Sequence, residues 1–218
     1  NLNDVEVTFA EGRTGEINGV HVVSPATVTL EKVDIANAVQ HGIYVEGASA
    51  NVSATDTTVV KAGVDGVLVS KGGQISLIRK NIQNPKERSL FVQSANSKAK
   101  VDTVTLEGGK RGVQIYSGGA VEGNGVTITS PTQYGITCGD NGSGFNITGF
   151  TVTNCGTTAV NVYDSAVATV TNGTITNPGK HGANVDGSAT LTLNSVGITF
   201  DAGRSGDFDG VYLQKTST

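Results

Sequence analysis

The tetrad Gly42-Ile43-Tyr44-Val45, a small residue followed by alternating apolar residues, recurs along almost the whole chain. Successive copies start at a nearly constant spacing of about 23 residues, and only the last interval is clearly longer. A fixed period of this length identifies a repeat array, and the array decides how every other motif is interpreted. The copies begin at Gly19, Gly42, Gly66, Ser89, Gly112, Gly135, Ala159, Gly182 and Gly210.

Each repeat carries the pattern of short β-strands. Apolar side chains alternate with period two after the small residue, as in Ile43/Val45, and a second anchor of the form Leu30-x-x-Val33-x-Ile35 lies further along the repeat. Alternation of β-branched residues is typical of strands, and no segment long enough for a helix combines a helical period with helix-forming residues. Three strands therefore fit into each repeat.

Three strands in such a short repeat predict an all-β fold, a single right-handed parallel β-helix (solenoid) of about eight to nine coils. Each strand pairs with the same strand one coil further on, at a spacing of roughly 4.8 Å. The 30 glycines and the absence of tryptophan suit repeats that bury small apolar stripes rather than one large core. A leucine-rich repeat is the alternative, but it needs only one strand per repeat. We expect residues 1–218 to form one β-helix unit without a second domain.

Coils of this length, rich in Val, Thr, Gly and Asn, with stacked glycines and recurring steps such as Thr153-Asn154 and Thr176-Asn177, resemble the passenger domains of bacterial autotransporters of the pertactin-like type. The fold is also shared with pectin-lyase-like proteins. The resemblance implies secretion to the bacterial surface or beyond, a role as a virulence factor, and a chain that is a fragment of a longer passenger.

Charge and hydropathy favour no nucleic-acid partner and no insertion into a membrane. The formal net charge is −4, and eight of the 15 Lys and Arg residues lie between Arg79 and Arg111, where only three acids occur. No apolar run approaches the roughly 20 residues of a transmembrane helix. The positive zone in the middle of the array favours an acidic protein surface or an anionic glycan as partner.

The outward positions of the first strand predict a binding surface. Tyr44, Leu68 and Phe91 fall on three successive coils, and Arg88 and Arg111 stand next to one another at the neighbouring corner. Exposed aromatic side chains are typical of interfaces, and adjacent like charges favour a partner that neutralises them. An adjoining loop that covers the stripe is the alternative. The predicted binding residues are Tyr44, Leu68, Arg88, Phe91, Lys98, Lys100, Arg111 and Tyr116.

These observations lead to the expectation of a non-enzymatic protein that binds a host cell-surface receptor or glycan, as an adhesin or as a secreted receptor-activating ligand. A polysaccharide lyase or glycoside hydrolase is one alternative. It requires a groove lined by at least two carboxylates and a lysine or arginine on contiguous coils. Asp34 and Asp56 appear stacked, but a solvated polar face explains them equally well. We therefore expect no catalytic residue, cofactor or metal. A structural spacer is the remaining alternative.

Two similar loops and two cysteines complete the candidate sites. The loop with Arg13 and Glu16 has a near-copy with Arg204 and Asp207, and either could clamp an anion, although an ion pair that fastens the loop is the simpler explanation. Cys138 and Cys155 lie in one repeat and either form a disulfide or fill the core as thiols. Exposed terminal coils would favour end-to-end association.

Overall fold

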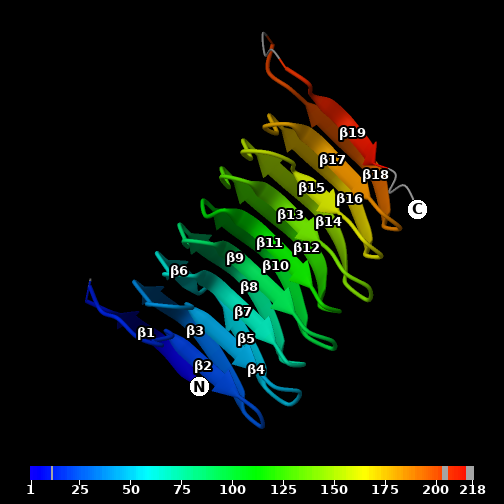
Figure 1. Cartoon of the computed structure of the whole chain (residues 1–218). Coiled ribbons are helices and arrows are strands. Elements are labelled where there is room, and N and C mark those ends of the chain that lie inside the picture. Colours follow the sequence, from blue (N-terminus) through cyan, green and yellow to red (C-terminus); the bar gives the residue numbers. More distant parts are fainter. Residues whose placement is uncertain (11, 203–205, 215–218) are drawn as a thin grey trace.

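The computed structural model describes residues 1–10, 12–202 and 206–214 as an elongated coil of parallel strands (Figure 1). The strands form two sheets, which we call sheet A and sheet B. Sheet A has the order β1-β3-β5-β8-β10-β12-β14-β16-β18, with β6 pairing to β3 and β8, and sheet B has the order β2-β4-β7-β9-β11-β13-β15-β17-β19. The predicted right-handed parallel β-helix is confirmed, and none of the described residues is helical.

The strand bounds follow the predicted repeats closely. Sheet A contains β1 (Leu2–Thr8), β3 (Thr27–Ala36), β5 (Asn51–Thr55), β6 (Thr58–Val60), β8 (Gln74–Gln83), β10 (Lys98–Glu107), β12 (Ala120–Thr129), β14 (Gly144–Thr153), β16 (Val167–Thr176) and β18 (Thr190–Thr199). Sheet B contains β2 (Val20–Val23), β4 (Ile43–Glu46), β7 (Asp65–Ser70), β9 (Arg88–Gln93), β11 (Arg111–Tyr116), β13 (Tyr134–Cys138), β15 (Val160–Val162), β17 (His181–Asp186) and β19 (Asp209–Gln214).

The second and third predicted segments of most coils run as one bent strand of sheet A. The bend is made by a residue in the left-handed region, which ordinary L-residues visit rarely. These residues stack from coil to coil as a bend column: Asp4, Lys32, Asp56, Arg79, Thr103, Gly125, Gly149, Asn172 and Ser195. Only between β5 and β6 does the bend interrupt the strand among the described coils.

The first four residues of the bend column alternate in charge. Asp4, Lys32, Asp56 and Arg79 follow one another on successive coils, with Lys32 Nζ 3.9 Å from Asp4 Oδ1. Arg79 donates two hydrogen bonds to Asp56, of 2.7 and 2.8 Å, and this ion pair lowers the pKa of the Asp56 carboxyl. Opposite charges on neighbouring parallel strands stabilise their alignment modestly when they are exposed.

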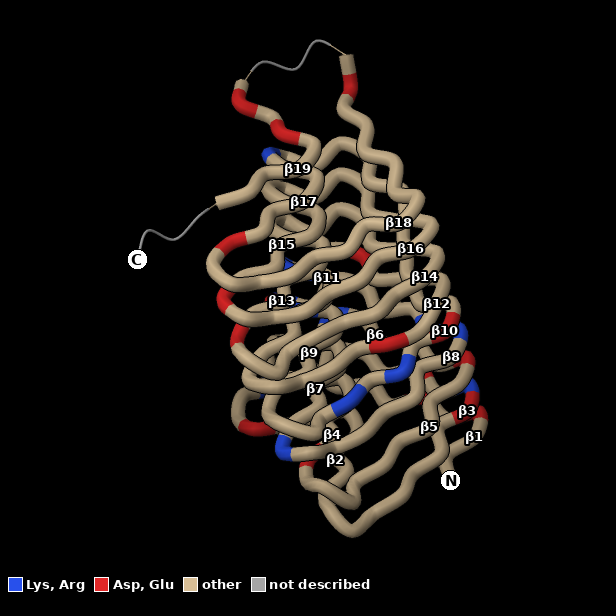
Figure 2. The backbone as a smooth tube through the Cα atoms, turned by 90° about the vertical axis from the view of Figure 1, so that its right-hand side faces the viewer, with Lys and Arg blue, Asp and Glu red and all other residues tan. Residues whose placement is uncertain are grey.

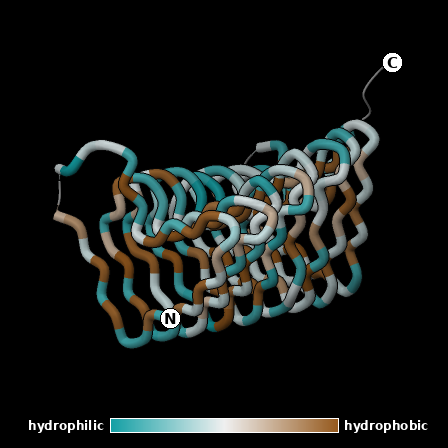
Figure 3. The backbone as a smooth tube through the Cα atoms, turned by 90° about the horizontal axis from the view of Figure 1, so that it is seen from below, coloured by the Kyte–Doolittle hydropathy of each residue, from teal (hydrophilic) through white to brown (hydrophobic). Residues whose placement is uncertain are grey.

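The core is a set of apolar ladders inside the coil. Inward residues such as Leu30, Leu77, Ile82 and Ile128 are fully buried, while outward residues of the same strands are mostly polar. The alternation of brown and teal along the strands in Figure 3 displays this pattern. Each coil buries its stripe against the coils before and after it, which is how a solenoid accumulates stability.

Crowding explains why the tetrad begins with a small residue. A Cβ at Gly42 would lie 2.2 Å from Val59 Cγ1 and 2.6 Å from the carbonyl oxygen of Gly66. The chain turns into sheet B at this point, directly against the ladder of sheet A. A larger side chain at Gly42 would therefore clash with both the sheet A ladder and the next coil.

Candidate functional site

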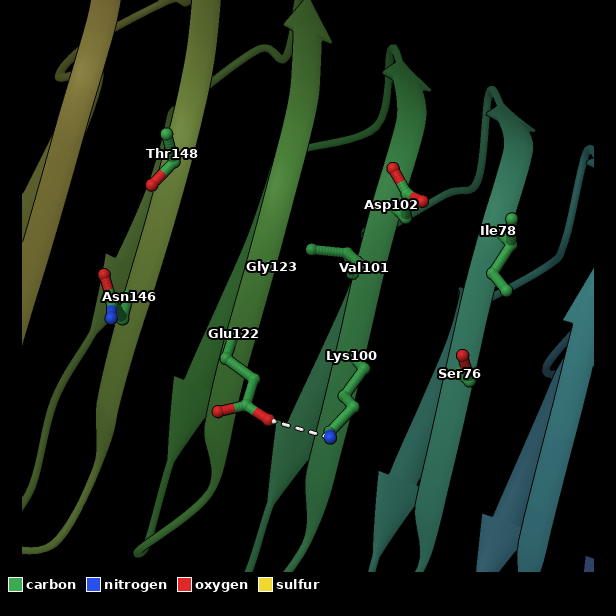
Figure 4. A pocket seen from close by; sticks show the side chains of 9 residues that line it. All are labelled: Ser76, Ile78, Lys100, Val101, Asp102, Glu122, Gly123, Asn146 and Thr148. Carbon is green, nitrogen blue, oxygen red and sulfur yellow. Dashed lines mark ion pairs between the residues drawn. The ribbon is translucent and has the colours of Figure 1, made fainter.

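A groove of about 450 Å³ lies on the outer face of sheet A, in the middle of the array. Four successive strands line it, and Figure 4 shows their side chains along the groove. Outward positions of a strand normally project polar groups into solvent, so the groove collects polar side chains from several coils. The lining residues are Ser76 and Ile78 of β8, Lys100, Val101 and Asp102 of β10, Glu122 and Gly123 of β12, and Asn146 and Thr148 of β14.

Gly123 shapes the groove where β12 passes β10. It pairs in register with Val101, and its φ of 146° lies in a region that L-side chains rarely adopt. A Cβ at this position would lie 1.8 Å from the Val101 carbonyl oxygen. Only glycine therefore allows this backbone arrangement, which leaves both residues lining the groove.

Three charged groups stand on the two central coils of the groove. Lys100 pairs in register with Glu122, and Lys100 Nζ lies 3.4 Å from Glu122 Oε1. Asp102 follows on the same face of β10, and its Oδ1 accepts a hydrogen bond of 3.0 Å from the Thr103 hydroxyl. Figure 4 shows Glu122 and Lys100 facing each other and Asp102 further along the strand. Asp102 and Glu122 are thus diagonal neighbours on adjacent coils.

This arrangement supplies the groups that acid–base cleavage of a glycosidic bond needs. Diagonal neighbours on adjacent strands are separated by roughly 7–8 Å at their backbones. Glycoside hydrolases typically use such a pair of carboxyl groups, one as general acid and the other as base or nucleophile. The groove therefore fulfils the condition set for the enzymatic alternative, two carboxylates and a lysine on contiguous coils.

Asp102 and Glu122 were not singled out from the sequence. The reason is a local change of period, because the step from Lys100 to its partner Glu122 is shorter than the preceding step from Gln74 to Lys98. A constant period therefore misaligns them. The available signal was the cluster Lys98-x-Lys100-x-Asp102 on the outward face, which was interpreted only as a basic zone.

The predicted stacking of Asp34 and Asp56 is wrong. Asp34 pairs in register with Thr58, which lies beyond Asp56 in the chain. Asp56 instead occupies the bend column and is held by Arg79. Asp56 takes the bend position equivalent to Lys32, two residues before the partner of Asp34, so the two acids do not form a carboxylate pair.

The predicted aromatic stripe is aligned as expected but is not exposed. Tyr44, Leu68 and Phe91 pair in register on β4, β7 and β9. Leu68 is 6% and Phe91 7% exposed, and only Tyr44 is half-buried. The Arg88 guanidinium lies 3.9 Å from the centre of the Phe91 ring and covers it. The expectation of an open apolar binding surface is therefore corrected.

One arginine of the neighbouring corner of sheet B is neutralised by the chain itself. Arg88 donates hydrogen bonds of 2.5 and 3.0 Å to the fully buried Asp65 carboxylate. His41 Nδ1 lies 3.1 Å from the same carboxylate. Arg88 and Arg111 are in register, as predicted, but of the two only Arg88 has a carboxylate partner among the described residues. The pair of Arg88 and Asp65 therefore suits a structural role.

The remaining predicted binding residues lie on different faces. Lys98 and Lys100 belong to sheet A, whereas Arg111 and Tyr116 belong to sheet B. Arg111 Nη1 donates to Gln114 Oε1 at 3.4 Å, and the Tyr116 ring lies 6.3 Å from that of Tyr163. The eight residues therefore do not form one continuous surface. In Figure 2 the Lys and Arg residues colour mainly the lower and middle coils.

The two remaining groups of predicted site residues are the long loops and the two cysteines. Arg13, Glu16 and Asp207 are exposed, and Arg204 lies outside the described residues. Cys138 and Cys155 are buried free thiols, so the disulfide alternative is wrong and the core-filling alternative is confirmed. Burial raises the pKa of Cys138 to about 12 and also raises the pKa of Cys155, which keeps both thiols protonated and unreactive.

The described residues contain neither a metal-binding cluster nor a membrane-spanning helix. No group of three or more His, Cys, Asp or Glu side chains is placed to hold a metal ion there. Within the same part of the chain, no helix is long and apolar enough to cross a bilayer.

The coil is similar to that of a solved enzyme structure. The catalytic unit of a thermostable GH87 α-1,3-glucanase from Streptomyces thermodiastaticus strain HF3-3 superposes with a TM-score of 0.56 at 14% sequence identity. The match covers 84% of this chain and 46% of that structure, so the chain spans less than half of the glucanase unit. At this identity the similarity establishes a shared fold.

The comparison corrects the expectation that the chain is not an enzyme. That expectation rested on finding no convincing pair of carboxylates with a basic residue on contiguous coils, whereas a similar coil forms part of the catalytic unit of a glucanase. No curated protein matches the sequence significantly. An autotransporter origin has therefore no support from a relative.

A family pattern accounts for most of the sequence. The pattern described as "Right handed beta helix region" matches residues 18–196, which include β2 to β17 and most of β18. The parallel strand order of both sheets is consistent with this description. The chain belongs to the family of right-handed β-helix proteins.

Proposed function

We propose that this β-helix processes a polysaccharide and that the sheet A groove is where a glycosidic bond is cleaved. The observation that carries the proposal is the presence of Asp102, Glu122 and Lys100 on two contiguous coils of one open groove. Similarity to a glucanase coil agrees with this assignment but supports it only through the fold. A polymeric substrate is processed outside the cell, so we also place the protein there.

The side chains of the groove take different roles in the proposed cleavage of the glycosidic bond. One carboxyl group of the Asp102/Glu122 pair protonates the departing glycosidic oxygen while the other activates a water molecule, as in hydrolysis with inversion. Lys100 and the neutral groups of Ser76, Asn146 and Thr148 bind substrate hydroxyls or carboxylates along the groove. The open ends allow a chain to extend over several coils.

The receptor-binding hypothesis has lost the observation on which it depended. It required Leu68 and Phe91 to be exposed, and both are buried. We therefore propose processing of a glycan in place of adhesion to a host receptor.

The test is an activity assay with matched carboxylate variants. The protein is incubated with α-1,3-glucan, β-1,3-glucan and polygalacturonate, and new reducing ends and unsaturated products are measured separately. Asp102→Asn and Glu122→Gln should each lower the rate by about 10²-fold or more, because each removes an acid–base group. The control is Asp56→Asn, an exposed carboxylate of sheet A outside the groove.

The outcomes separate the alternatives. Reducing ends without unsaturated products identify a hydrolase, and unsaturated products identify a lyase at the same groove. Cleavage that survives both groove variants would place the active site elsewhere. No cleavage of any polymer by the unaltered protein would contradict the proposal.

A further inference from the structure

A second hollow surface runs along the outer face of sheet B in the later coils. Two adjoining hollows of about 320 and 340 Å³ share Tyr134, Asn161 and Asn184 as lining residues. Together they extend from β11 to β19, four coil steps, which corresponds to about 19 Å along the axis at the normal strand spacing. We call this surface the sheet B trough. It is lined chiefly by Gln114, Tyr134, Thr137, Asn161, Asn184 and Tyr212.

The floor of the trough is a column of amide and hydroxyl side chains. Gln114, Thr137, Asn161 and Asn184 stand at equivalent positions of β11, β13, β15 and β17 and pair in register. Asn184 Nδ2 donates a hydrogen bond of 2.7 Å to Asn161 Oδ1. Amides and hydroxyls both donate and accept hydrogen bonds, as the hydroxyl groups of a sugar do.

Three buried polar atoms of the trough have no hydrogen-bond partner within the described ranges. They are Thr137 Oγ1, Asn184 Oδ1 and Arg111 Nε, and the Thr137 residue is only 4% exposed. His181 Nδ1, which lines the second hollow, also lacks a hydrogen bond but lies 3.1 Å from the Asp209 carboxylate. Buried polar atoms without a partner are uncommon and unfavourable. Atoms of this kind also occur elsewhere in the described coils, but the trough brings several of them together beside two hollows, which favours a polar ligand there.

Aromatic rings stand beside this column. Tyr134 lines both hollows, Tyr163 borders the first, and Tyr212, 39% exposed, borders the second. The Tyr212 ring stacks on His181 with ring centres 4.7 Å apart. A ring face is apolar with a polar edge, so it can pack against the C–H face of a sugar while neighbouring amides bind its hydroxyls.

The charge of the trough favours a neutral ligand. Its charged lining residues are Arg111 and Lys180 on one side and Asp186 on the other, so no single sign prevails. The upper coils in Figure 2 are mostly uncoloured across β13, β15 and β17. A peptide that adds a strand needs a free sheet edge, whereas β11, β13, β15 and β17 are already paired on both sides and only β19 lies at the end of the sheet.

We infer that the sheet B trough binds a neutral polysaccharide chain lying along the axis of the coil. This site lies on the other sheet from the proposed cleavage groove and is independent of it. Its described lining lacks an adjacent pair of carboxylates like Asp102 and Glu122, so its role is to bind the chain without cleaving it.

The experiment is calorimetric titration of the intact chain with neutral tetrasaccharides of α-1,3-, β-1,3- and β-1,4-linked glucose, and with tetragalacturonate as the anionic comparison. At least one neutral tetrasaccharide should bind, and Tyr134→Ala and Gln114→Ala should each weaken it about tenfold, the loss of one well-made contact. Tyr44→Ala is the matched control, because it removes a half-buried tyrosine of sheet B outside the trough. The double variant Asp102→Asn/Glu122→Gln should retain this binding.

Several results would overturn the inference. These are the absence of binding by every neutral tetrasaccharide, tighter binding of tetragalacturonate, or an equal loss in the Tyr44→Ala control. Loss of binding only in the groove double variant would also overturn it and would assign the ligand to the sheet A groove. Loss of cleavage in the groove variants with unchanged binding would support both sites separately.

Discussion

Lys80 occupies a position inside the coil, between Val104 on the next coil and the buried Thr57 on the preceding one. It pairs in register with Val104 and is 2% exposed, and its Nζ has no hydrogen-bond partner in the described residues. Burial lowers the pKa of Lys80 to about 7, although Asp34 and Asp56 oppose the shift. A lysine in this environment is largely neutral above pH 7.

The stability of the fold should therefore depend on Lys80 and on pH. Between about pH 7 and 10 the unfolded chain binds a proton that the folded chain lacks, so stability rises with pH by up to about 1.4 kcal/mol per unit. Replacing Lys80 with methionine should remove this slope and stabilise the fold at pH 7. Thermal unfolding at pH 7, 8 and 9, followed by circular dichroism, measures the difference between the variant and the unaltered protein.

The effect of Lys80 is the difference in pH dependence between the variant and the unaltered protein. Buried thiols such as Cys138 make stability fall with rising pH, but they do so equally in both proteins. Lys86→Met is the control, since Lys86 is exposed. An identical pH dependence in the Lys80→Met variant would show that Lys80 keeps an ordinary pKa.

The bend column determines how a sheet A strand changes direction. Gly149 has a φ of 67°, and a Cβ there would find no atom closer than 3.5 Å. The position therefore requires a left-handed backbone but leaves room for a side chain. At the tetrad glycines space is the constraint instead, because a Cβ at Gly42 would lie 2.2 Å from its nearest atom.

Substitutions at Gly149 should separate backbone strain from crowding. Gly149→Val should destabilise the fold by roughly 1–2 kcal/mol, because a β-branched L-residue is unfavourable in the left-handed region. Gly149→Asn should cost clearly less, as Asn172 already adopts this conformation one coil further on. Urea unfolding of both variants provides the comparison. Equal losses would point to crowding and contradict the assignment of strain.

Alternation and period predicted the strands, the two faces and most stacked columns, including Tyr44, Leu68 and Phe91. They did so because a parallel ladder repeats the same environment at every coil. The prediction was wrong for Asp34 and Asp56, because they lie 22 residues apart whereas these two coils pair at an offset of 24 residues. It missed Glu122 because the offset between β10 and β12 shortens to 22 residues. The repeat pattern also could not predict that the Arg88 side chain packs over the Phe91 ring, because side-chain conformation depends on contacts between coils.

At the scale of the whole molecule, the coil has a well-packed middle and looser ends. Inward residues of β10 and β14 are fully buried, whereas β18 and β19 are mostly half-buried or exposed. In a solenoid each coil is stabilised only by its direct neighbours, so the outermost coils have fewer contacts. The sheet A groove lies in the better-packed part.

Hydrogen exchange should follow this gradient. Amides of β8, β10, β12 and β14 should exchange more slowly than those of β1, β2, β18 and β19, because local opening needs less free energy at the ends. Mass spectrometry of peptides after deuterium labelling resolves the difference. Uniform protection along the chain would mean that the array unfolds only as a whole.

The alternating charges of Asp4, Lys32, Asp56 and Arg79 bear on how the growing coil finds its alignment. If a coil paired with the next coil but one instead of its direct neighbour, Asp4 would face Asp56 and Lys32 would face Arg79. The misplaced winding would then be repelled at a point where the uniform Val and Ile ladders offer little discrimination. These four side chains thus favour the correct alignment of coils at one end of the molecule. Added salt should weaken this preference, because it screens exposed charges.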